Sequence, residues 1–347
     1  MEGIFAAVTT PFYPDERIYF RKLEANMARY SRSLLAGMVV LGSTGEAPML
    51  NDFETRDVLR VAAEAAAPDK VLIAGIGRES VRATVELAEV AAELNYDAVL
   101  VRTSMYYAGQ MSPAAVLNYF RSVADRSPLP VLLYNIPKCV PYQIPAELVA
   151  ELASHPNIIG IKDSSGSVEV TRGYVAATRT APRRTVTVTP IFEAVTARML
   201  AQKAADSGSG AFVSAASLSG GAAVATAAIS TRTKSVGFQV LSGSASAALQ
   251  SLEAGASGAI LALAAFAPQA CQEVYQAWKD HDPKLAEEKQ SRIAAANKRI
   301  VGELGIGGVK YACDFNGYYG GRPRAPLLTV TADEKLEIEC LLAEIRN

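Results

Sequence analysis

The chain has 347 residues, of which half are hydrophobic and a fifth are charged, and its formal net charge is −1. This composition predicts a globular fold and gives no basic field for nucleic acid or an acidic membrane surface. No apolar run is long enough to span a membrane, and the first residues lack a cleaved-signal pattern, so we expect a cytoplasmic protein. Four scattered cysteines and two histidines favour neither a disulfide framework nor a metal site.

Short apolar runs alternate with stretches of helical periodicity along most of the chain. The predicted strands are residues 4–8, 37–41, 71–74, 98–101, 131–134, 158–161, 238–241 and 258–261. The predicted helices are residues 17–35, 51–66, 80–94, 113–124, 145–153, 168–178 and 264–278. Eight such units predict an α/β fold, a parallel (βα)8 TIM barrel. An open doubly wound sheet is the alternative, but no strand is followed by the GxGxxG motif of dinucleotide-binding sheets.

The regular spacing of the strands breaks once, after the predicted helix at residues 168–178. Residues of about 181–235, rich in Ala, Ser, Thr and Gly, are surplus to the barrel, and residues 191–205 within them are predicted as helix. Because this insert follows a helix and precedes a strand, it should emerge on the N-terminal face, opposite the catalytic loops. We interpret it as a peripheral embellishment or subunit contact, with an active-site lid as the alternative. The barrel then occupies residues 1–282, and residues 283–347 form a C-terminal helical extension.

Lys162 ends the sixth predicted strand and is followed by the polar turn DSSG at residues 163–166. An amine beside apolar walls is disfavoured in its charged form, so more of it is available as a nucleophile. Lys162 is therefore a candidate for Schiff-base formation. The alternative is a lysine at a strand end whose amine extends into water.

Polar groups follow other strands at the same end of the predicted barrel. The turn that holds Ser43 and Thr44 offers hydroxyls and backbone N–H groups to a carboxylate. Tyr134, at the end of the adjacent fifth strand, can move protons, although a half-buried tyrosine that caps a strand is the alternative. Lysine, tyrosine and an anion-binding turn together suit imine chemistry on a 2-oxo acid, with no cofactor.

Three further residues are expected to line the same pocket, because they lie in or just after strands six, seven and eight. They are Ser164, Ser244 and Ile260. Tyr106 and Tyr107 follow the fourth strand and are directed towards the same end of the barrel.

Four motifs resemble those of the dihydrodipicolinate synthase / N-acetylneuraminate lyase family: TTPF at 9–12, GSTGE at 42–46, YNIP at 134–137 and GIKD at 160–163. The family consists of pyruvate-dependent class I aldolases and related lyases on (βα)8 barrels, usually homotetramers arranged as dimers of dimers. The resemblance implies the same for this chain, with pyruvate or a related 2-oxo acid as its small-molecule partner.

The resemblance also implies roles for individual residues. Lys162 matches the Schiff-base lysine, Tyr134 the proton shuttle and Ser43 the relay hydroxyl, while Ser43 and Thr44 match the carboxylate-binding turn. Tyr107 matches a tyrosine that family members contribute across a dimer interface, and the adjacent Tyr106 is the alternative.

Departures from the family pattern bear on the substrate. Cys139 occupies the position where the synthase branch has an arginine for a distal carboxylate, and the direction of Lys138 along the loop differs. Residues 241–245 and 317–327 resemble the 4-hydroxy-2-oxoglutarate aldolase branch, which usually has asparagine at the position of Cys139 and Thr-Gly at 140–141. We therefore expect cleavage of a 4-hydroxy- or 3-deoxy-2-oxo acid to pyruvate and an aldehyde. Dihydrodipicolinate synthase, a 2-oxo-3-deoxy sugar acid dehydratase and a non-enzymatic scaffold are the alternatives.

Overall fold

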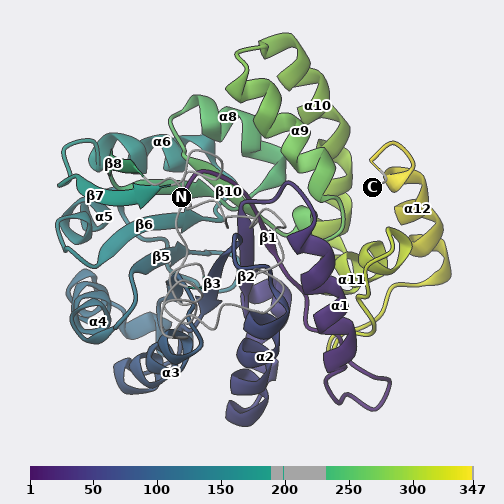
Figure 1. Ribbon diagram of the computed structural model, residues 1–347, viewed down its shortest axis with the longest axis horizontal. Helices are drawn as coiled ribbons and strands as arrows, with labels where there is room; N and C mark the ends of the chain where they lie inside the picture. Colours follow the sequence, from purple (N-terminus) through teal and green to yellow (C-terminus); the bar gives the residue numbers. More distant parts are fainter. Residues whose placement is uncertain (189–197, 199–231, 346–347) are drawn as a thin grey trace, which may run out of the picture.

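Eight parallel strands close into a barrel, which confirms the predicted (βα)8 architecture. The computed structural model describes residues 1–188, 198 and 232–345, and Figure 1 shows helices around the strands. The barrel strands are β1 (Gly3–Ala7), β2 (Gly37–Val40), β3 (Val71–Gly75), β4 (Ala98–Arg102), β5 (Val131–Asn135), β6 (Ile158–Asp163), β9 (Gln239–Ser242) and β10 (Gly258–Leu261). They pair in this order, and β10 pairs back to β1.

The helices of the barrel lie on its outer surface, and a C-terminal group of helices follows them (Figure 1). The outer helices are α1 (Phe20–Ser31), α2 (Asp52–Ala65), α3 (Val81–Glu93), α4 (Pro113–Arg126), α5 (Ala146–Ala153), α6 (Val168–Ala177), α8 (Ala248–Glu253) and α9 (Pro268–Lys279). The C-terminal group comprises α10 (Pro283–Ala296), a π-helix (Asn297–Glu303), α11 (Gly305–Phe315) and α12 (Ala332–Leu342). Since α10 packs along α9, the division at residue 282 stays a prediction.

Alternating side chains of the strands divide the core into two parts, as expected for strands whose successive residues face opposite sides. The larger part lies between the strands and the helices. The smaller part fills the barrel and consists of Phe5, Ala7, Val39, Val71, Ile73, Ala98, Leu100, Leu132, Tyr134, Ile136, Val140, Leu241 and Ile260. The barrel is therefore packed, and chemistry is confined to its mouth.

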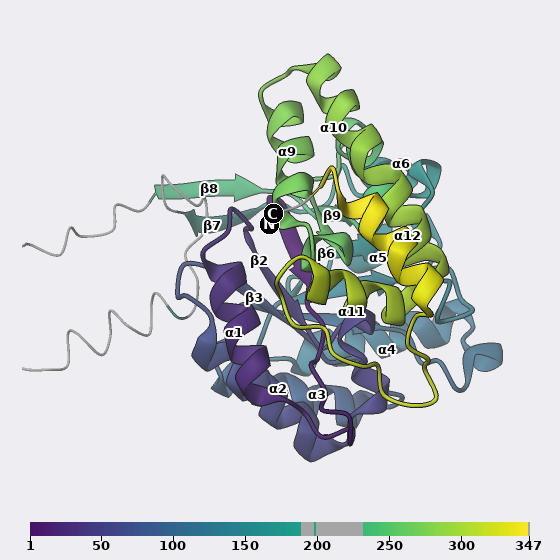
Figure 2. The ribbon, with the colours of Figure 1, turned by 90° about the vertical axis from the view of Figure 1, so that its right-hand side faces the viewer.

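The predicted insert between the sixth helix and the seventh barrel strand is present. Its described ends form β7 (Arg184–Val188) and β8 (Arg232–Val236), an antiparallel ribbon that extends away from the barrel (Figure 2). Arg184 donates to the carbonyls of His155, Pro156 and Ile158 at the beginning of β6. The ribbon therefore joins the barrel at its N-terminal face. The helix predicted at 191–205 lies outside the described residues.

The C-terminal group braces a loop at the opposite face. Gln290 of α10 donates through Nε2 to the carbonyl of Ala245 (2.8 Å) and accepts from the N–H of Leu249 (3.0 Å). Asn297 of the π-helix donates to Oγ of Ser246 (2.7 Å). These contacts hold the chain that leaves β9 and carries Ser244.

The same C-terminal group also anchors the turn after β2. Nζ of Lys310 lies 2.5 Å from Oε1 of Glu46, and both side chains are fully buried. The backbone N–H of Arg324 donates to Oε2 of Glu46 (2.8 Å), and its guanidinium binds Glu54 of α2 through two hydrogen bonds. Residues from the two ends of the sequence thus form one buried ionic network.

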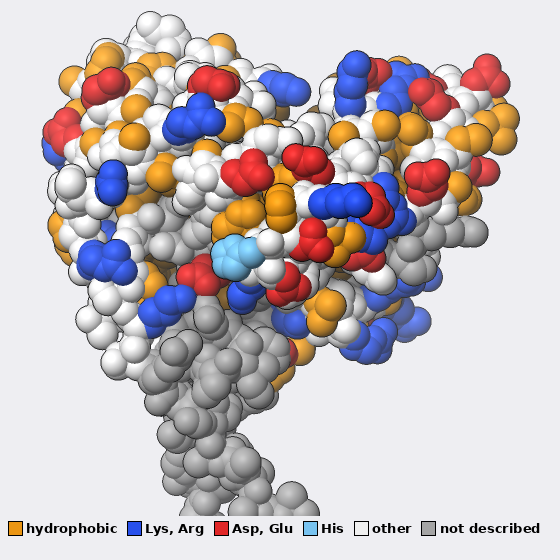
Figure 3. Space-filling model, turned by 90° about the horizontal axis from the view of Figure 1, so that it is seen from above, with side chains coloured by type: hydrophobic (Ala, Val, Ile, Leu, Met, Phe, Trp, Pro, Cys, Tyr) orange, Lys and Arg blue, Asp and Glu red, His pale blue; other side chains and the backbone are white. Residues whose placement is uncertain are grey.

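Some predicted bounds differ from the observed ones. Helix α1 begins at Phe20 rather than residue 17, because Tyr13 and Arg17 pair through their backbones and Tyr13 stacks on Tyr19. Strand β4 extends one residue further, to Arg102. None of the described helices is long and apolar enough to cross a membrane. Figure 3 shows basic and acidic side chains mixed over one face, without a field of a single sign.

Candidate active site

A row of four residues crosses adjacent strands at the mouth of the barrel. Arg102 of β4 pairs with Tyr134 of β5, Tyr134 pairs with Lys162 of β6, and Lys162 pairs with Leu241 of β9. Leu132 pairs with Gly160 while Val131 pairs with Ile158, so one extra residue of β6 precedes the row. Such bulges occur next to active sites, where they change the direction of a side chain.

Lys162 and Tyr134 are in direct contact. The side chain of Lys162 is almost fully buried, with 4% of the residue exposed, and its Nζ lies 4.5 Å from the centroid of the Tyr134 ring. Tyr134 is 7% exposed and belongs to the apolar cluster inside the barrel. The structure therefore excludes the alternative of a strand-end lysine whose amine extends into water. An amine in this position can react only with a molecule that enters the mouth.

The turn that carries Ser43 and Thr44 is held in an unusual conformation. Residues Ser43–Gly45 form one 3₁₀ turn, and Leu41 (φ 60°), two residues before it, and Glu46 (φ 55°), directly after it, have left-handed backbones. Residues other than glycine rarely adopt this conformation, and such strain is concentrated at functional sites. Oγ1 of Thr10 donates to the carbonyl of Gly45 (2.6 Å). Buried contacts thus fix the turn on both sides.

The residue after Lys162 organises the next loop. The buried carboxylate of Asp163 accepts hydrogen bonds from Nδ2 of Asn135 (2.8 Å), from both the N–H and the hydroxyl of Ser165, and from Oγ1 of Thr171. The N–H of Ser164 donates to the carbonyl of Asn135 (2.8 Å). The end of β6 is therefore rigid on the side opposite Lys162.

The three further residues predicted to line the pocket lie just after β6, just after β9 and within β10, and none of them lines the cavity that Ser43 and Tyr134 share. Ser164 packs against Gly243, where a Cβ atom would lie 2.0 Å from Oγ of Ser164, so only glycine allows this approach. Ser244 follows at once, and its N–H donates to Oγ of Ser242 (3.4 Å). Ile260 of β10 is fully buried in the cluster that contains Tyr134.

Tyr106 and Tyr107 lie apart from this group. They are 81% and 52% exposed and contact each other edge to face, with ring centroids 5.1 Å apart. Glu79 anchors their loop: its Oε2 accepts from the hydroxyl of Ser104 (2.7 Å) and from the N–H groups of Met105 (2.9 Å) and Tyr106 (3.0 Å). Among the described residues of a single chain, Lys162 contacts Tyr134, whereas Tyr107 contacts Tyr106.

A cavity of about 300 Å³ opens beside the row of four residues. It is lined by Leu41, Gly42, Ser43, Ala47, Pro48, Leu50, Gly75, Gly77, Arg78, Glu79, Leu100, Arg102, Met105 and Tyr134. The predicted residues Ser43 and Tyr134 thus share one cavity. Lys162 does not line it, but contacts Tyr134, which does.

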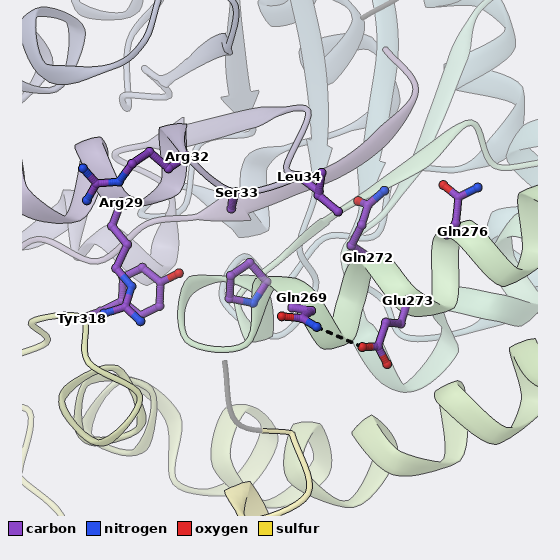
Figure 4. A pocket seen from close by; sticks show the side chains of 10 residues that line it. Arg29, Arg32, Ser33, Leu34, Gln269, Gln272, Glu273, Gln276 and Tyr318 are labelled. Carbon is purple, nitrogen blue, oxygen red and sulfur yellow. Dashed lines mark hydrogen bonds between the residues drawn. The ribbon is translucent and has the colours of Figure 1, made fainter. Parts of the chain in front are cut away.

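A larger cavity, of about 510 Å³, lies outside the barrel between α1 and α9 (Figure 4). It is lined by Arg29, Arg32, Ser33, Leu34, Pro268, Gln269, Gln272, Glu273, Gln276 and Tyr318. The guanidinium of Arg29 already donates to the carbonyls of Gly317 and Asn316. None of the predicted site residues lines this cavity, so the candidate site is at the barrel mouth.

Arg102 also lines the cavity that Ser43 and Tyr134 share, although the sequence alone does not single it out. It occupies the same row as Tyr134 and Lys162, and 17% of its side chain is exposed. Burial raises the pKa of the Cys139 thiol, and Arg102, Lys138 and Lys162 oppose that rise through their positive charges. Basic side chains from β4, β6 and the loop itself therefore act on the position where the resemblance leads one to expect an arginine.

Comparison with known proteins shows which family the chain belongs to. Residues 1–189 and 221–345 match the model of the dihydrodipicolinate synthetase family. The chain belongs to this family. The gap in the match falls within the predicted insert.

Two curated relatives carry different names. The chain is 35% identical over 168 residues to the 4-hydroxy-tetrahydrodipicolinate synthase of Methanosarcina acetivorans, an alignment that covers 48% of this chain and 56% of that protein. It is 37% identical over 171 residues to the probable mitochondrial 4-hydroxy-2-oxoglutarate aldolase of Emericella nidulans, covering 48% and 55%. The chain thus spans little more than half the length of the curated relatives it matches.

Solved structures resemble the whole chain. Dihydrodipicolinate synthase DapA-2 of Bacillus anthracis superimposes with a TM-score of 0.79 at 22% identity, over 100% of this chain and 99% of that chain. A prophage protein of the same family from E. coli, solved with pyruvate, gives 0.78 at 24% identity, over 99% and 98%. At these identities the likeness concerns the fold alone.

Proposed function

We propose that the protein is a class I aldolase that binds 2-oxo acids as a Schiff base on Lys162. Its reaction is cleavage of a 4-hydroxy- or 3-deoxy-2-oxo acid to pyruvate and an aldehyde, as in a 4-hydroxy-2-oxoglutarate aldolase. The observation that carries this proposal is the buried Nζ of Lys162, 4.5 Å from the ring centroid of Tyr134 on the adjacent strand. Membership of the family supports the same reaction class.

The proposed mechanism uses only side chains and the substrate. The neutral amine of Lys162 attacks the C2 carbonyl, and loss of water from the carbinolamine gives a protonated imine. A base removes the proton of the C4 hydroxyl, the C3–C4 bond breaks, and its electron pair enters the imine to form an enamine while the aldehyde leaves. Protonation of C3 and hydrolysis of the imine release pyruvate and restore the amine.

Several further residues have proposed roles in this reaction. Tyr134 is the proton shuttle, because its phenol belongs to the row beside Lys162 and also lines the cavity. Ser43 relays protons, and together with Thr44 it binds the substrate carboxylate through hydroxyl and backbone N–H groups of the strained turn. Ser164, Ser244 and Ile260 do not line that cavity, and their proposed role is contact with the substrate on the side of Lys162.

Condensation of pyruvate with aspartate semialdehyde, the dihydrodipicolinate synthase reaction, is the second candidate. Several curated relatives carry the name 4-hydroxy-tetrahydrodipicolinate synthase, which favours it. Cys139 at the expected arginine position opposes it. Dehydration of a 2-oxo-3-deoxy sugar acid through the same imine is a third reaction that this machinery would support.

We further propose a homotetramer, a dimer of dimers, in which Tyr107 completes the site of a neighbouring subunit. The exposure of Tyr106 and Tyr107 supports this arrangement, since large exposed aromatic residues often mark contact surfaces. The reaction as written needs no cofactor or metal. A cytoplasmic location stays a prediction.

Borohydride reduction in the presence of pyruvate tests the covalent step. We expect an irreversible adduct on Lys162, located by peptide mass mapping, and none on the Lys162→Ala variant. Lys138→Ala is the matched control, because this nearby lysine is exposed and should leave the adduct unchanged. Tyr134→Phe should fold and slow turnover by about 10²–10⁴-fold, the usual contribution of a positioned proton donor.

Well-folded wild-type protein without an adduct would exclude the covalent mechanism. A screen of 4-hydroxy-2-oxo and 2-oxo-3-deoxy acids for pyruvate release then separates the aldolase from the synthase and the dehydratase, because only the aldolase produces pyruvate together with an aldehyde.

A further inference from the structure

Arg102 extends into the mouth of the barrel from the row that holds Tyr134 and Lys162. Ala98 and Leu100, the alternate residues of β4, belong to the cluster inside the barrel, so the side chain of Arg102 leaves the same face of the strand. It lines the cavity together with Tyr134 and Ser43. A charged side chain therefore faces the mouth of the barrel beside Tyr134, the residue that contacts Lys162.

Only some of the N–H donors of the Arg102 guanidinium form hydrogen bonds with other groups of the described chain. Nη1 donates to the carbonyl of Thr103 (2.9 Å) and Nη2 to Oε1 of Glu79 (3.0 Å). A guanidinium has five N–H donors in a planar arrangement that suits a carboxylate. Donors thus remain for a second anion, while Glu79 and Thr103 hold the group in place.

The cavity carries an excess of positive charge. Arg78 and Arg102 line it, with Glu79 as the carboxylate that pairs with Arg102. Nη2 of Arg78 donates to the hydroxyl of Thr55 (3.2 Å), and in the described part of the chain no carboxylate lies within ion-pair distance of Arg78. Burial lowers the pKa of Arg78, so its charged form gains from an added anion.

The backbone is shaped to admit this arginine. A Cβ atom at Gly77 would lie 2.6 Å from Cγ of Arg102 and 2.8 Å from its backbone nitrogen. Only glycine therefore allows Arg102 its observed position. One strand, β5, separates β4 from β6, so the backbones of β4 and β6 lie about 10 Å apart. The side chains of Arg102 and Lys162, with a short acid between them, can bridge this distance.

We propose that Arg102 binds the distal carboxylate of a dicarboxylic 2-oxo acid, with 4-hydroxy-2-oxoglutarate as the type of substrate. This inference rests on the proposed aldolase function and names its substrate class. Arg102 takes over, from β4, the task that an arginine at position 139 would perform from the loop after β5. Arg78 adds to the positive field at the same end of the cavity.

Two substrates that differ only at the far end test this assignment. 4-Hydroxy-2-oxoglutarate yields pyruvate and glyoxylate, whereas 4-hydroxy-2-oxopentanoate, with a methyl group in place of the carboxylate, yields pyruvate and acetaldehyde. For Arg102→Met we expect kcat/KM for the dicarboxylate to fall about 10–100-fold, as for loss of a charged hydrogen bond. The value for the methyl analogue should change by less than about threefold.

Three controls distinguish loss of carboxylate binding from misfolding of the variant. Borohydride trapping of pyruvate on Lys162 should be unchanged in Arg102→Met, which shows that the variant folds. Arg102→Lys should lose less than Arg102→Met, because the charge remains while the fork is lost. Arg82→Met, which removes an arginine of α3 whose side chain is 85% exposed, should alter neither substrate.

Equal losses on both substrates, or no loss on either while trapping persists, would overturn the role of Arg102 and leave the aldolase intact. Failure of the wild type to trap pyruvate would reject the aldolase itself and this inference with it.

Discussion

Glu79 shows how a single carboxylate can hold the loop that carries Tyr106 and Tyr107. Burial raises the pKa of Glu79, but hydrogen bonds from Ser104, Tyr106, Met105 and Arg102 outweigh it and lower the pKa from 4.5 to about 2. Because the folded-state pKa lies below that of the unfolded chain, the ionised carboxylate stabilises the fold fully above about pH 4.5. This stabilisation is lost as the pH falls towards 2.

The free energy of unfolding of Glu79→Gln should therefore be lower than that of the wild type by a constant amount from pH 7 to pH 5. Below pH 5 this difference should become smaller as the pH falls. Urea unfolding at a series of pH values measures this difference. The amides of Met105 and Tyr106, which donate to Glu79, should exchange faster with deuterium in the variant at pH 7. Glu86→Gln is the control, because Glu86 is exposed on α3, and it should show neither effect. A loss of stability in Glu79→Gln that does not change with pH would contradict this explanation.

At the residue level, Lys162, Tyr134 and Ser43 were predicted as site residues because several polar residues follow apolar strands at one end of the barrel and lie in motifs that resemble those of one family. Arg102 was missed for a physical reason. The predicted strand at residues 98–101 stops one residue short of Arg102, and a sequence does not show which residue of the neighbouring strand lies opposite it. Only the pairing of Arg102 with Tyr134 shows that it belongs to the same row.

Among the elements, the buried ion pair between α11 and the turn after β2 has the clearest energetic consequence. Burial lowers the pKa of Lys310, although the charge of Glu46 opposes this effect. Lys310→Met should reduce the free energy of unfolding by about 3–5 kcal/mol, because Glu46 is left as an uncompensated buried charge. Urea denaturation measures the loss, and the exposed Lys279→Met is the matched control.

The double variant tests the cause. Adding Glu46→Gln to Lys310→Met removes the stranded charge while keeping an acceptor for the N–H of Arg324, so part of the stability should return. If the two substitutions were simply additive, the ion pair would not be the source of the loss.

Element by element, the sequence predicted all eight barrel strands, since buried parallel strands are continuous apolar runs between turns. It did not predict β7 and β8. Their residues are Arg, Thr, Val, Lys and Ser, which do not form such runs, and the two strands pair with each other rather than with the barrel. The π-helix at Asn297–Glu303 was also unpredictable, because its residues are those of an ordinary helix.

For the whole molecule, the proposed tetramer predicts shared active sites. Lys162→Ala and Tyr107→Phe should each be nearly inactive alone. After subunit exchange, a hybrid dimer holds one site with an intact Lys162 and the partner subunit's Tyr107, so up to about a quarter of all sites should recover. Pyruvate release from the mixture measures the recovery.

Mixing Lys162→Ala with Tyr134→Phe is the control, because both residues belong to the same site and complementation should not occur. Activity that stays at the level of the separate variants, in protein shown by ultracentrifugation to exchange subunits, would place Tyr107 outside the neighbouring site.

The network of Lys310, Arg324 and Glu46 has a consequence for biosynthesis. The hydrogen bond from Arg324 to Glu46 joins residues 278 positions apart in the sequence. At ordinary rates of translation, the strained turn with Ser43 leaves the ribosome on the order of tens of seconds before its anchors are made. A nascent chain can therefore form its first strands early, but the turn after β2 gains its contacts with Lys310 and Arg324 only after translation has passed residue 324.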